Sequence, residues 1–120
     1  MSKIMVIDDE ESVCEVLNKI FSQEGHDVVT ETSSEKAYDR VVKEKPDCIL
    51  MDIKMPMIGG IELLAKIKAH NKDLRIIMIT GYGNIENAIE SIKTGAYDYI
   101  TKPFDIDFIR SVVKRCLVKS

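Results

Sequence analysis

The sequence lacks several features that mark common classes of protein. No apolar run is long enough to cross a bilayer, and no apolar segment follows Met1-Ser2-Lys3 as it would in a signal peptide. The three cysteines, Cys14, Cys48 and Cys116, are an odd number without metal-ligand spacing, and we interpret them as buried reduced thiols. A net charge of -3 suggests neither a nucleic-acid-binding domain nor a disordered acidic tail. We therefore expect a cytoplasmic globular protein that contacts no membrane.

The chain has instead five short apolar runs that alternate with five amphipathic segments. Its 120 residues are the size of one domain, predicted to span residues 1–120. The runs are predicted to be strands, and the segments, in which apolar residues recur at helical spacing, are predicted to be helices. This alternation favours an α/β fold, with a parallel sheet covered by helices on both faces. The predicted strands are 3–7, 27–30 (expected at an edge), 47–52, 74–80 and 96–101.

The predicted helices each carry an apolar stripe that would pack against the sheet. Gly25 and Gly95 suit helix C-termini, and Asp105 can cap the last helix. In chain order, the stripes are Val13, Val16, Leu17, Ile20 and Phe21; Ala37, Tyr38, Val41 and Val42; Ile61, Leu64 and Ile67; Ile85, Ala88, Ile89 and Ile92; and Ile106, Ile109, Val113, Cys116 and Leu117.

Polar and charged side chains follow four of the five predicted strands. Right-handed crossovers place the C-terminal ends of parallel strands at one edge of the sheet. Ligands of open α/β sheets bind at that edge. This edge, called the rim below, gathers three acids, a hydroxyl and an ammonium: Asp8, Asp9, Asp52, Thr80 and Lys102. Each of them has an ordinary explanation when taken alone, but their convergence indicates a site centred on Asp52.

The acids of the rim predict a bound cation. Carboxylates on neighbouring strands would lie about 5 Å apart and repel each other by roughly 3 kcal/mol at an effective dielectric constant near 20. Oxygen ligands with room for water suit Mg²⁺, whereas His26 and His70 fall outside the rim. A carboxylate beside Mg²⁺ can accept a phosphoryl group as an aspartyl phosphate. Asp52 is the expected acceptor, with Lys102 and the Thr80 hydroxyl contacting phosphoryl oxygens.

These residues, in this order, resemble the receiver domains of two-component response regulators. The resemblance runs from Lys3 to about Leu117, and residues 80–105 are most similar to receivers of enhancer-binding activators of the nitrogen-regulation type. Lys54 and Tyr82 are also similar to residues of the single-domain receiver of the sporulation phosphorelay. The matching positions are Asp8-Asp9, Asp52 with Met55-Pro56 and Gly60, Thr80-Gly81, and Tyr99 with Lys102-Pro103-Phe104.

The resemblance implies a flavodoxin-like doubly wound fold, with strand order 2-1-3-4-5, and phosphorylation of Asp52. The donor would be a phosphohistidine on a sensor histidine kinase or a phosphotransfer protein, or a small acyl or amido phosphate. It also implies that Mg²⁺ is bound by Asp9, Asp52 and the backbone carbonyl of Lys54, with Asp8 acting through a water. Lys102 would contact the phosphoryl group, and its bond to Pro103 is expected to be cis.

The resemblance further implies how the signal would be read. A phosphoryl group would draw the Thr80 hydroxyl toward it, and Tyr99 would rotate inward, reshaping the face formed by residues 84–117. Lys54 and Tyr82 would slow self-hydrolysis, so that the phosphoryl group lasts for minutes or longer. The chain would not be an enzyme beyond its own phosphorylation and dephosphorylation.

The partners implied by the resemblance leave two outputs open. The chain is either the receiver of a transcription activator or a stand-alone intermediate of a phosphorelay. The resemblance admits a homodimer formed on phosphorylation, and DNA binding only through a domain not present in this chain.

Three other functions with related chemistry fit the residues less well. A flavin-binding carrier needs a phosphate loop after the first strand, where this chain has acidic residues 8–11. A nucleotide-binding enzyme needs glycine motifs that are absent, since Glu86 stands in place of a third glycine after Gly81 and Gly83. A haloacid-dehalogenase-like phosphatase usually has an acid two residues after its nucleophile, where this chain has Lys54.

Overall fold

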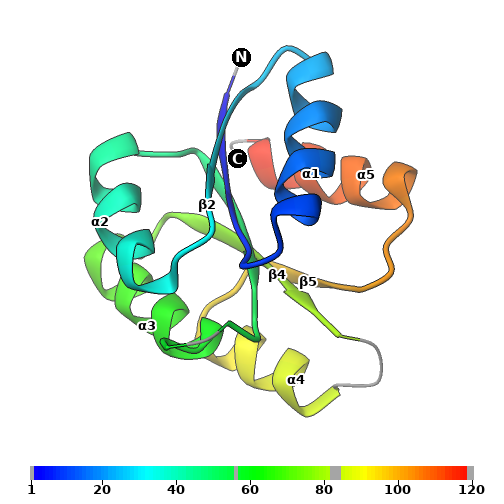
Figure 1. The fold of residues 1–120 in the computed structure, drawn as a ribbon. Coiled ribbons are helices and arrows are strands. Elements are labelled where there is room, and N and C mark those ends of the chain that lie inside the picture. Colours follow the sequence, from blue (N-terminus) through cyan, green and yellow to red (C-terminus); the bar gives the residue numbers. More distant parts are fainter. Residues whose placement is uncertain (1, 56, 82–84, 119–120) are drawn as a thin grey trace.

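Five parallel strands form one sheet in the order β2-β1-β3-β4-β5, which confirms the predicted order and the edge position of β2 (Figure 1). The computed structural model describes residues 2–55, 57–81 and 85–118. The strands are β1 Lys3–Ile7, β2 Asp27–Glu31, β3 Cys48–Asp52, β4 Arg75–Thr80 and β5 Asp98–Thr101. The helices are α1 Glu11–Gln23, α2 Ser34–Glu44, α3 Gly60–His70, α4 Ile85–Thr94 and α5 Ile106–Leu117.

Side chains that alternate along the strands build two cores, one on each face of the sheet. Ile4 and Val6 of β1 pack with α1 and α5, whereas Met5 and Ile7 pack with α2 and α3. Figure 1 shows α1 and α5 together on one side of the sheet, with α2, α3 and α4 on the other. All five residues of β3 are buried, because this central strand is covered on both faces. The strand that ends in Asp52 is therefore held rigidly.

The helix-end signals predicted at Asp105, Gly25 and Gly95 act as expected, and Ser33 supplies a further cap. The side chains of Ser33 and Asp105 cap α2 and α5, each accepting a hydrogen bond from a backbone N–H of the first turn. Gly25 and Gly95, with φ angles of 91° and 122°, follow the ends of α1 and α4 in the conformation that favours glycine. The helices consequently start and stop close to the positions that the sequence indicates.

The predicted apolar stripes were wrong at several positions. In α4 the buried residues include Ala88 and Ser91, and the Ser91 hydroxyl donates to the Asn87 carbonyl within the same helix. A small side chain that satisfies its own hydrogen bond can therefore face the sheet, which turns the larger isoleucines outward. The residues predicted to pack on the sheet but found exposed are Val16, Val42, Ile89, Ile92 and Ile106.

The last strand is shorter than predicted. It begins at Asp98 instead of Ala96, because the backbone N–H of Ala96 donates to the Ser91 carbonyl and so closes the end of α4. The Tyr97 N–H then donates to the Ile76 carbonyl of β4, which guides the chain into the sheet. Residues 96–97 thus belong to the helix–strand connection.

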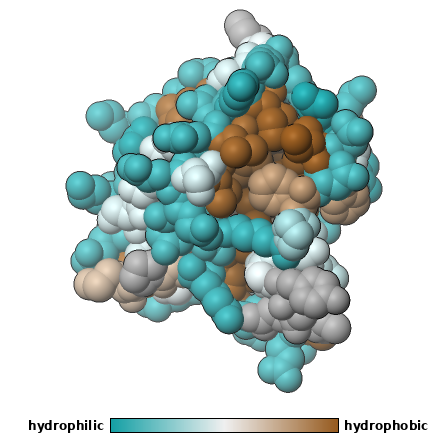
Figure 2. All heavy atoms as spheres, turned by 45° about the vertical axis from the view of Figure 1, so that its right-hand side comes forward, coloured by the Kyte–Doolittle hydropathy of each residue, from teal (hydrophilic) through white to brown (hydrophobic). Residues whose placement is uncertain are grey.

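The face that carries α1 and α5 shows apolar side chains gathered together and ringed by hydrophilic ones (Figure 2). Val16 of α1 and Ile106 and Phe108 of α5 are exposed apolar side chains of these two helices.

Among the described residues, no helix combines the length and the apolar character needed to cross a bilayer.

Candidate functional site

The rim is built where neighbouring strands end. In the parallel pairing of β1 with β3, Asp8 follows β1 at the level where Asp52 ends β3. Thr80 is the last residue of β4, which pairs with β3 on its other side. Lys102 comes directly after β5, and its backbone N–H donates to the Thr80 carbonyl at 2.8 Å. Residues distant in sequence are thus brought to one edge by the backbone alone.

Three carboxylates meet at this edge. Carboxylate oxygens of Asp8, Asp9 and Asp52 lie within 4.8 Å of one another. Asp8 is fully buried and Asp52 is 5% exposed, whereas Asp9 is exposed. One oxygen of Asp8, Oδ1, accepts the Glu10 N–H at 2.9 Å. The other, Oδ2, is buried without a hydrogen-bond partner in the described part of the chain.

The crowding of these acids changes their protonation. Burial, and after it the charge of Asp8, raise the pKa of Asp52 to about 6, against the lowering effects of Lys102 and the Lys54 N–H. Burial also raises the pKa of Asp8, although its hydrogen bond from Glu10 and the nearby Lys102 oppose this. Two acids with raised pKa values at one place indicate that the rim needs more positive charge than Lys102 supplies.

Lys102 is the cation of the rim. Its Nζ lies 3.1 Å from Asp8 Oδ2, 3.2 Å from Glu10 Oε1 and 3.7 Å from Asp52 Oδ2. Burial lowers the pKa of Lys102, but Asp8, Asp52 and Glu10 outweigh burial and raise that pKa above its usual value. The side chain therefore stays charged at neutral pH. The peptide bond from Lys102 to Pro103 is cis.

The acids fit a small divalent cation. The Asp8 Oδ2 atom is buried and is paired with Lys102, but it makes no hydrogen bond within the described residues, and Asp9 and Asp52 present oxygens close to it. The backbone N–H of Lys54 donates to Asp52 Oδ1 at 3.3 Å, which sets the Lys54 peptide beside this carboxylate. A set of hard oxygen donors, open to water on the side of Asp9, has the chemistry that Mg²⁺ prefers.

A glycine holds the loop that follows Asp52. The Gly60 N–H donates to the Ile53 carbonyl at 2.7 Å. A Cβ atom on Gly60 would lie 2.5 Å from the Asp52 carbonyl oxygen and 2.6 Å from the Ile53 Cα atom. The Ile58 N–H also donates to the Ser34 hydroxyl at 3.1 Å, tying the loop to α2. Only glycine permits this close return of the chain beside the acceptor strand.

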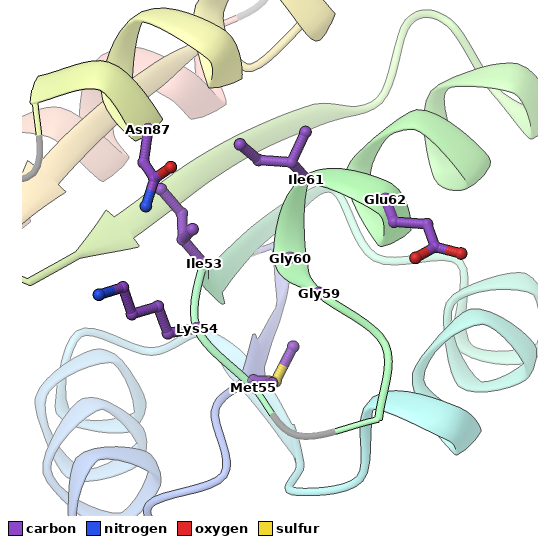
Figure 3. A pocket seen from close by; sticks show the side chains of 8 residues that line it. All are labelled: Ile53, Lys54, Met55, Gly59, Gly60, Ile61, Glu62 and Asn87. Carbon is purple, nitrogen blue, oxygen red and sulfur yellow. The ribbon is translucent and has the colours of Figure 1, made fainter.

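A surface pocket of about 510 Å³ lies next to this loop (Figure 3). In Figure 3, Asn87 of α4 points toward Ile53, while the Lys54 side chain extends away from the loop. Lys54 is exposed, so its side chain is available at the approach to Asp52. The lining residues are Ile53, Lys54, Met55, Gly59, Gly60, Ile61, Glu62 and Asn87.

The two residues expected to report the signal lie in different environments. Thr80 is buried, and its hydroxyl donates to the Gly81 carbonyl at 3.5 Å. Tyr99 is 40% exposed, so its ring is not packed behind Thr80 in this structure. Tyr82, expected to influence lifetime, and Pro56 of the motif after Asp52 lie outside the described residues.

Sequence reasoning missed Glu10 as a member of the rim. Its carboxylate forms an ion pair with Lys102, 92 residues away in the chain. An acidic block before a helix is ordinarily explained by a favourable interaction with the helix dipole, here that of α1. The signal that could have found it is its position, one residue after two predicted rim acids and on the same side as the only predicted rim cation.

Comparison with known proteins identifies a family whose sequences match this chain. The model of the response regulator receiver domain matches residues 4–114. The chain is 39% identical to sporulation initiation phosphotransferase F of Bacillus subtilis (strain 168), covering 96% of this chain and 93% of that protein. It is 33% identical to regulatory protein AtoC of Escherichia coli (strain K12), covering 98% of this chain but only 25% of that protein.

Solved structures agree with the observed fold. The receiver domain of NtrX from Brucella abortus is 36% identical, with a TM-score of 0.92 over 98% of this chain and 99% of that chain. A response regulator receiver domain protein from Clostridium thermocellum is 28% identical, with a TM-score of 0.92 over 98% of this chain and 94% of that chain. The flavodoxin-like arrangement predicted from the sequence is therefore confirmed.

Proposed function

Because this chain belongs to the response regulator receiver domain family, we propose that it accepts a phosphoryl group on Asp52 and thereby switches an output. The observation that carries the proposal is the convergence at the rim. The Asp52 carboxylate lies within 4.8 Å of Asp8 and Asp9 oxygens and 3.7 Å from the Lys102 ammonium. An acceptor, oxygen ligands for a cation, and a fixed positive charge thus share one edge of the sheet.

The transfer itself needs little covalent chemistry from the protein. An oxygen of the Asp52 carboxylate forms a bond to phosphorus while the bond from phosphorus to the donor's imidazole nitrogen breaks. The imidazole leaves with that electron pair and takes up a proton from solvent. Lys102 and the Thr80 hydroxyl contact phosphoryl oxygens, so that the main contribution of the chain is position and charge.

Receiver domains generally bind Mg²⁺ at an acidic pocket, and the acids of the rim suit this ion. We assign Asp9, Asp52 and the Lys54 carbonyl as its direct ligands, and Asp8 as a ligand through water. When bound, Mg²⁺ would neutralise charge on the phosphoryl oxygens. Asp8 holds Lys102 close by through the 3.1 Å ion pair, which keeps the second positive charge next to the acceptor.

The test is phosphorylation by a small donor. The protein is incubated with acetyl phosphate or phosphoramidate and Mg²⁺, and its intact mass is measured. We expect the gain of one phosphoryl group, lost in Asp52→Asn and on chelation of Mg²⁺. Absence of any gain with all donors would contradict the proposal, as would an equal gain in Asp52→Asn.

The output is proposed to be read at Thr80 and Tyr99. A phosphoryl group brings a charge of about -1.5 to -2 and new acceptor oxygens, which attract the Thr80 hydroxyl. The exposed Tyr99 ring then turns inward into the space that Thr80 leaves. This changes the α4-β5-α5 surface, defined by the exposed side chains Ile89, Ile92, Tyr97, Tyr99, Ile106 and Phe108. A phosphorylated dimer would form through this surface.

Tyr99→Ala separates the reading of the signal from its writing. We expect this variant to take up the phosphoryl group at the rate of the unchanged protein, because Tyr99 lies outside the rim. Phosphorylation-dependent dimerisation, measured by light scattering, should be lost. Dimerisation that persists in phosphorylated Tyr99→Ala would contradict the proposed switch.

The lifetime of the phosphoryl group is proposed to depend on Lys54. Its side chain is exposed two residues beyond Asp52, where water must approach the acyl phosphate. We expect half-lives of minutes or longer, and a shorter half-life in Lys54→Ala. Loss of the phosphoryl group within seconds from the unchanged protein, in Mg²⁺ buffer without a phosphatase, would contradict this.

A second output is favoured by the match to sporulation initiation phosphotransferase F over 93% of that protein. The chain would then pass its phosphoryl group to a histidine on a phosphotransfer protein. The alternative is the receiver of a transcription activator, in which DNA is bound by a separate domain. Radiolabelled phosphorylated protein, mixed with a histidine phosphotransfer protein, distinguishes them: label transfer supports the relay, and retention of the label supports the activator.

A further inference from the structure

The ammonium of Lys102 is shared among three carboxylates, and Asp52 is the most distant of them. Lys102 Nζ lies 3.1 Å from Asp8 and 3.2 Å from Glu10, but 3.7 Å from Asp52. The contact with Glu10 also meets the geometry of a hydrogen bond. Lys102 therefore lies nearer to the β1–α1 connection than to the residue proposed to take the phosphoryl group.

We propose that Glu10 is a positioning residue that holds Lys102 in this arrangement and must release it for Lys102 to contact a phosphoryl group on Asp52. The inference rests on the proposed function and adds to it a residue that sets the readiness of the site. Glu10 acts through Lys102 and does not itself touch the phosphoryl group.

The environments of the three acids identify the contact that gives way. Asp8 is fully buried, and within the described part of the chain Lys102 is the only cation that pairs with its Oδ2, so Asp8 keeps Lys102. The Glu10 side chain is 58% exposed and can exchange Lys102 for water. Exposed ion pairs of this kind change an equilibrium by about two- to fivefold. A phosphoryl group, with its larger charge, outcompetes Glu10 for Lys102.

Within residues 2–55, 57–81 and 85–118, the Glu10 carboxylate makes no hydrogen bond or ion pair other than its contact with Lys102. Glu10 is the N-cap residue of α1, but its side chain makes no capping hydrogen bond. Its backbone carbonyl accepts the N–H groups of Val13 and Cys14 whatever the side chain. Glu10→Gln therefore removes the charge and keeps the start of the helix.

Glu11 provides a matched control. It belongs to the same acidic block, is exposed, and makes no ion pair or side-chain hydrogen bond within residues 2–55, 57–81 and 85–118. Glu11→Gln removes the same charge near the rim without touching Lys102. General repulsion of an anionic donor is reduced in both variants, so a difference between them isolates the contact with Lys102.

The experiment measures initial rates of phosphorylation by phosphoramidate with Mg²⁺, followed by intact mass. We expect Glu10→Gln to react about two- to fivefold faster than Glu11→Gln. In the same proteins before phosphorylation, NMR signals of the Lys102 side chain should shift in Glu10→Gln and stay in place in Glu11→Gln. A purely structural role of Glu10 would alter the unfolding temperature but produce no faster reaction.

A rate for Glu10→Gln equal to or below that of Glu11→Gln overturns the inference, as does an unchanged Lys102 signal in Glu10→Gln. If the unchanged protein takes up no phosphoryl group, the proposed function fails instead. The Lys102 signals still report in that case whether Glu10 holds the ammonium. The two failures are therefore distinguishable.

Discussion

At the rim, charged side chains are buried, whereas on the α4-β5-α5 surface apolar side chains are exposed. Asp8 and Asp52 lie almost fully out of solvent, where they repel each other. The large apolar side chains of Ile89, Phe108 and Tyr99 are exposed to solvent, which is unfavourable for apolar groups. Both arrangements are energetically unfavourable in the chain alone, and each would be stabilised by binding a different group. A cation and a phosphoryl group suit the rim, and another protein surface suits the apolar side chains.

The loop that follows Asp52 at the rim depends on the absence of a side chain at Gly60. Gly60→Ala should lower the free energy of unfolding by about 2 to 4 kcal/mol, since its Cβ would overlap backbone atoms of Asp52 and Ile53. Urea denaturation monitored by circular dichroism measures the change. Gly59→Ala is the control, because a Cβ there meets nothing within 4 Å. Equal stabilities of the two variants would show that the loop yields easily.

Addition of Mg²⁺ should relieve the rim and leave the apolar surface unaffected. At a concentration 100 times its dissociation constant, Mg²⁺ should raise the free energy of unfolding by about 2.7 kcal/mol. Asp9→Asn should lose most of this gain, because it removes one of the assigned ligands of Mg²⁺. Asp9 is the exposed acid of the cluster and contributes little to packing, so the loss would reflect the metal site. Thermal unfolding with and without MgCl₂ tests this, with Glu11→Gln as the control that keeps the gain. Full stabilisation of Asp9→Asn by Mg²⁺ would contradict the assigned ligands.

Without metal, the buried charge of Asp52 should cost stability. The folded-state pKa of Asp52, about 6, lies above the ordinary value of 3.8, so between these pH values the folded protein holds a proton that the unfolded chain has lost. The free energy of unfolding should therefore fall by about 1 to 3 kcal/mol as pH rises from about 4 to about 7.

Asp52→Asn should lack this part of the fall and be the more stable protein near neutral pH. Urea denaturation at both pH values, in the presence of a chelator, measures the difference. The change in stability is compared between the two proteins because Asp8, whose pKa is also raised, titrates in both. Parallel pH profiles for the two proteins would argue against a strained carboxylate at the rim.

The apolar surface should contribute least to stability. Ile92→Ala is expected to change the free energy of unfolding by less than about 0.5 kcal/mol, because Ile92 is exposed and alanine favours helix. The matched change at a buried position, Ile109→Ala, should cost about 2 to 5 kcal/mol. A large loss of stability in Ile92→Ala would mean that this side chain belongs to the core.

The two regions also differ in how far the sequence predicts them. Asp8, Asp52, Thr80 and Lys102 were predicted to meet because parallel strands end at one edge, a rule that requires no knowledge of side-chain packing. The Mg²⁺ ligands, the acceptor and the switch residues remain proposals about what that meeting does. The contact between Glu10 and Lys102 was not predicted, since a side chain 58% exposed leaves no apolar pattern to read.

The surface of α4 shows the limit of pattern reading. Ile89 and Ile92 were placed in an inward stripe because isoleucine at helical spacing usually faces a core. The buried position is instead occupied by Ser91, which satisfies its hydroxyl within its own helix. Periodicity records which side chains are apolar, and a serine with an internal hydrogen bond is invisible to it. The close approach at Gly60 was likewise not predicted, because it depends on tertiary structure.

The hydrogen bond from the Lys102 N–H to the Thr80 carbonyl has a consequence for timing. It fixes the backbone at Lys102 and at Thr80, so under the proposed function each residue responds to a phosphoryl group by rotating its side chain. Side-chain rotations are far faster than hydrolysis over minutes. The duration of the active state would then equal the lifetime of the acyl phosphate bond, and the active conformation would end as soon as that bond is hydrolysed.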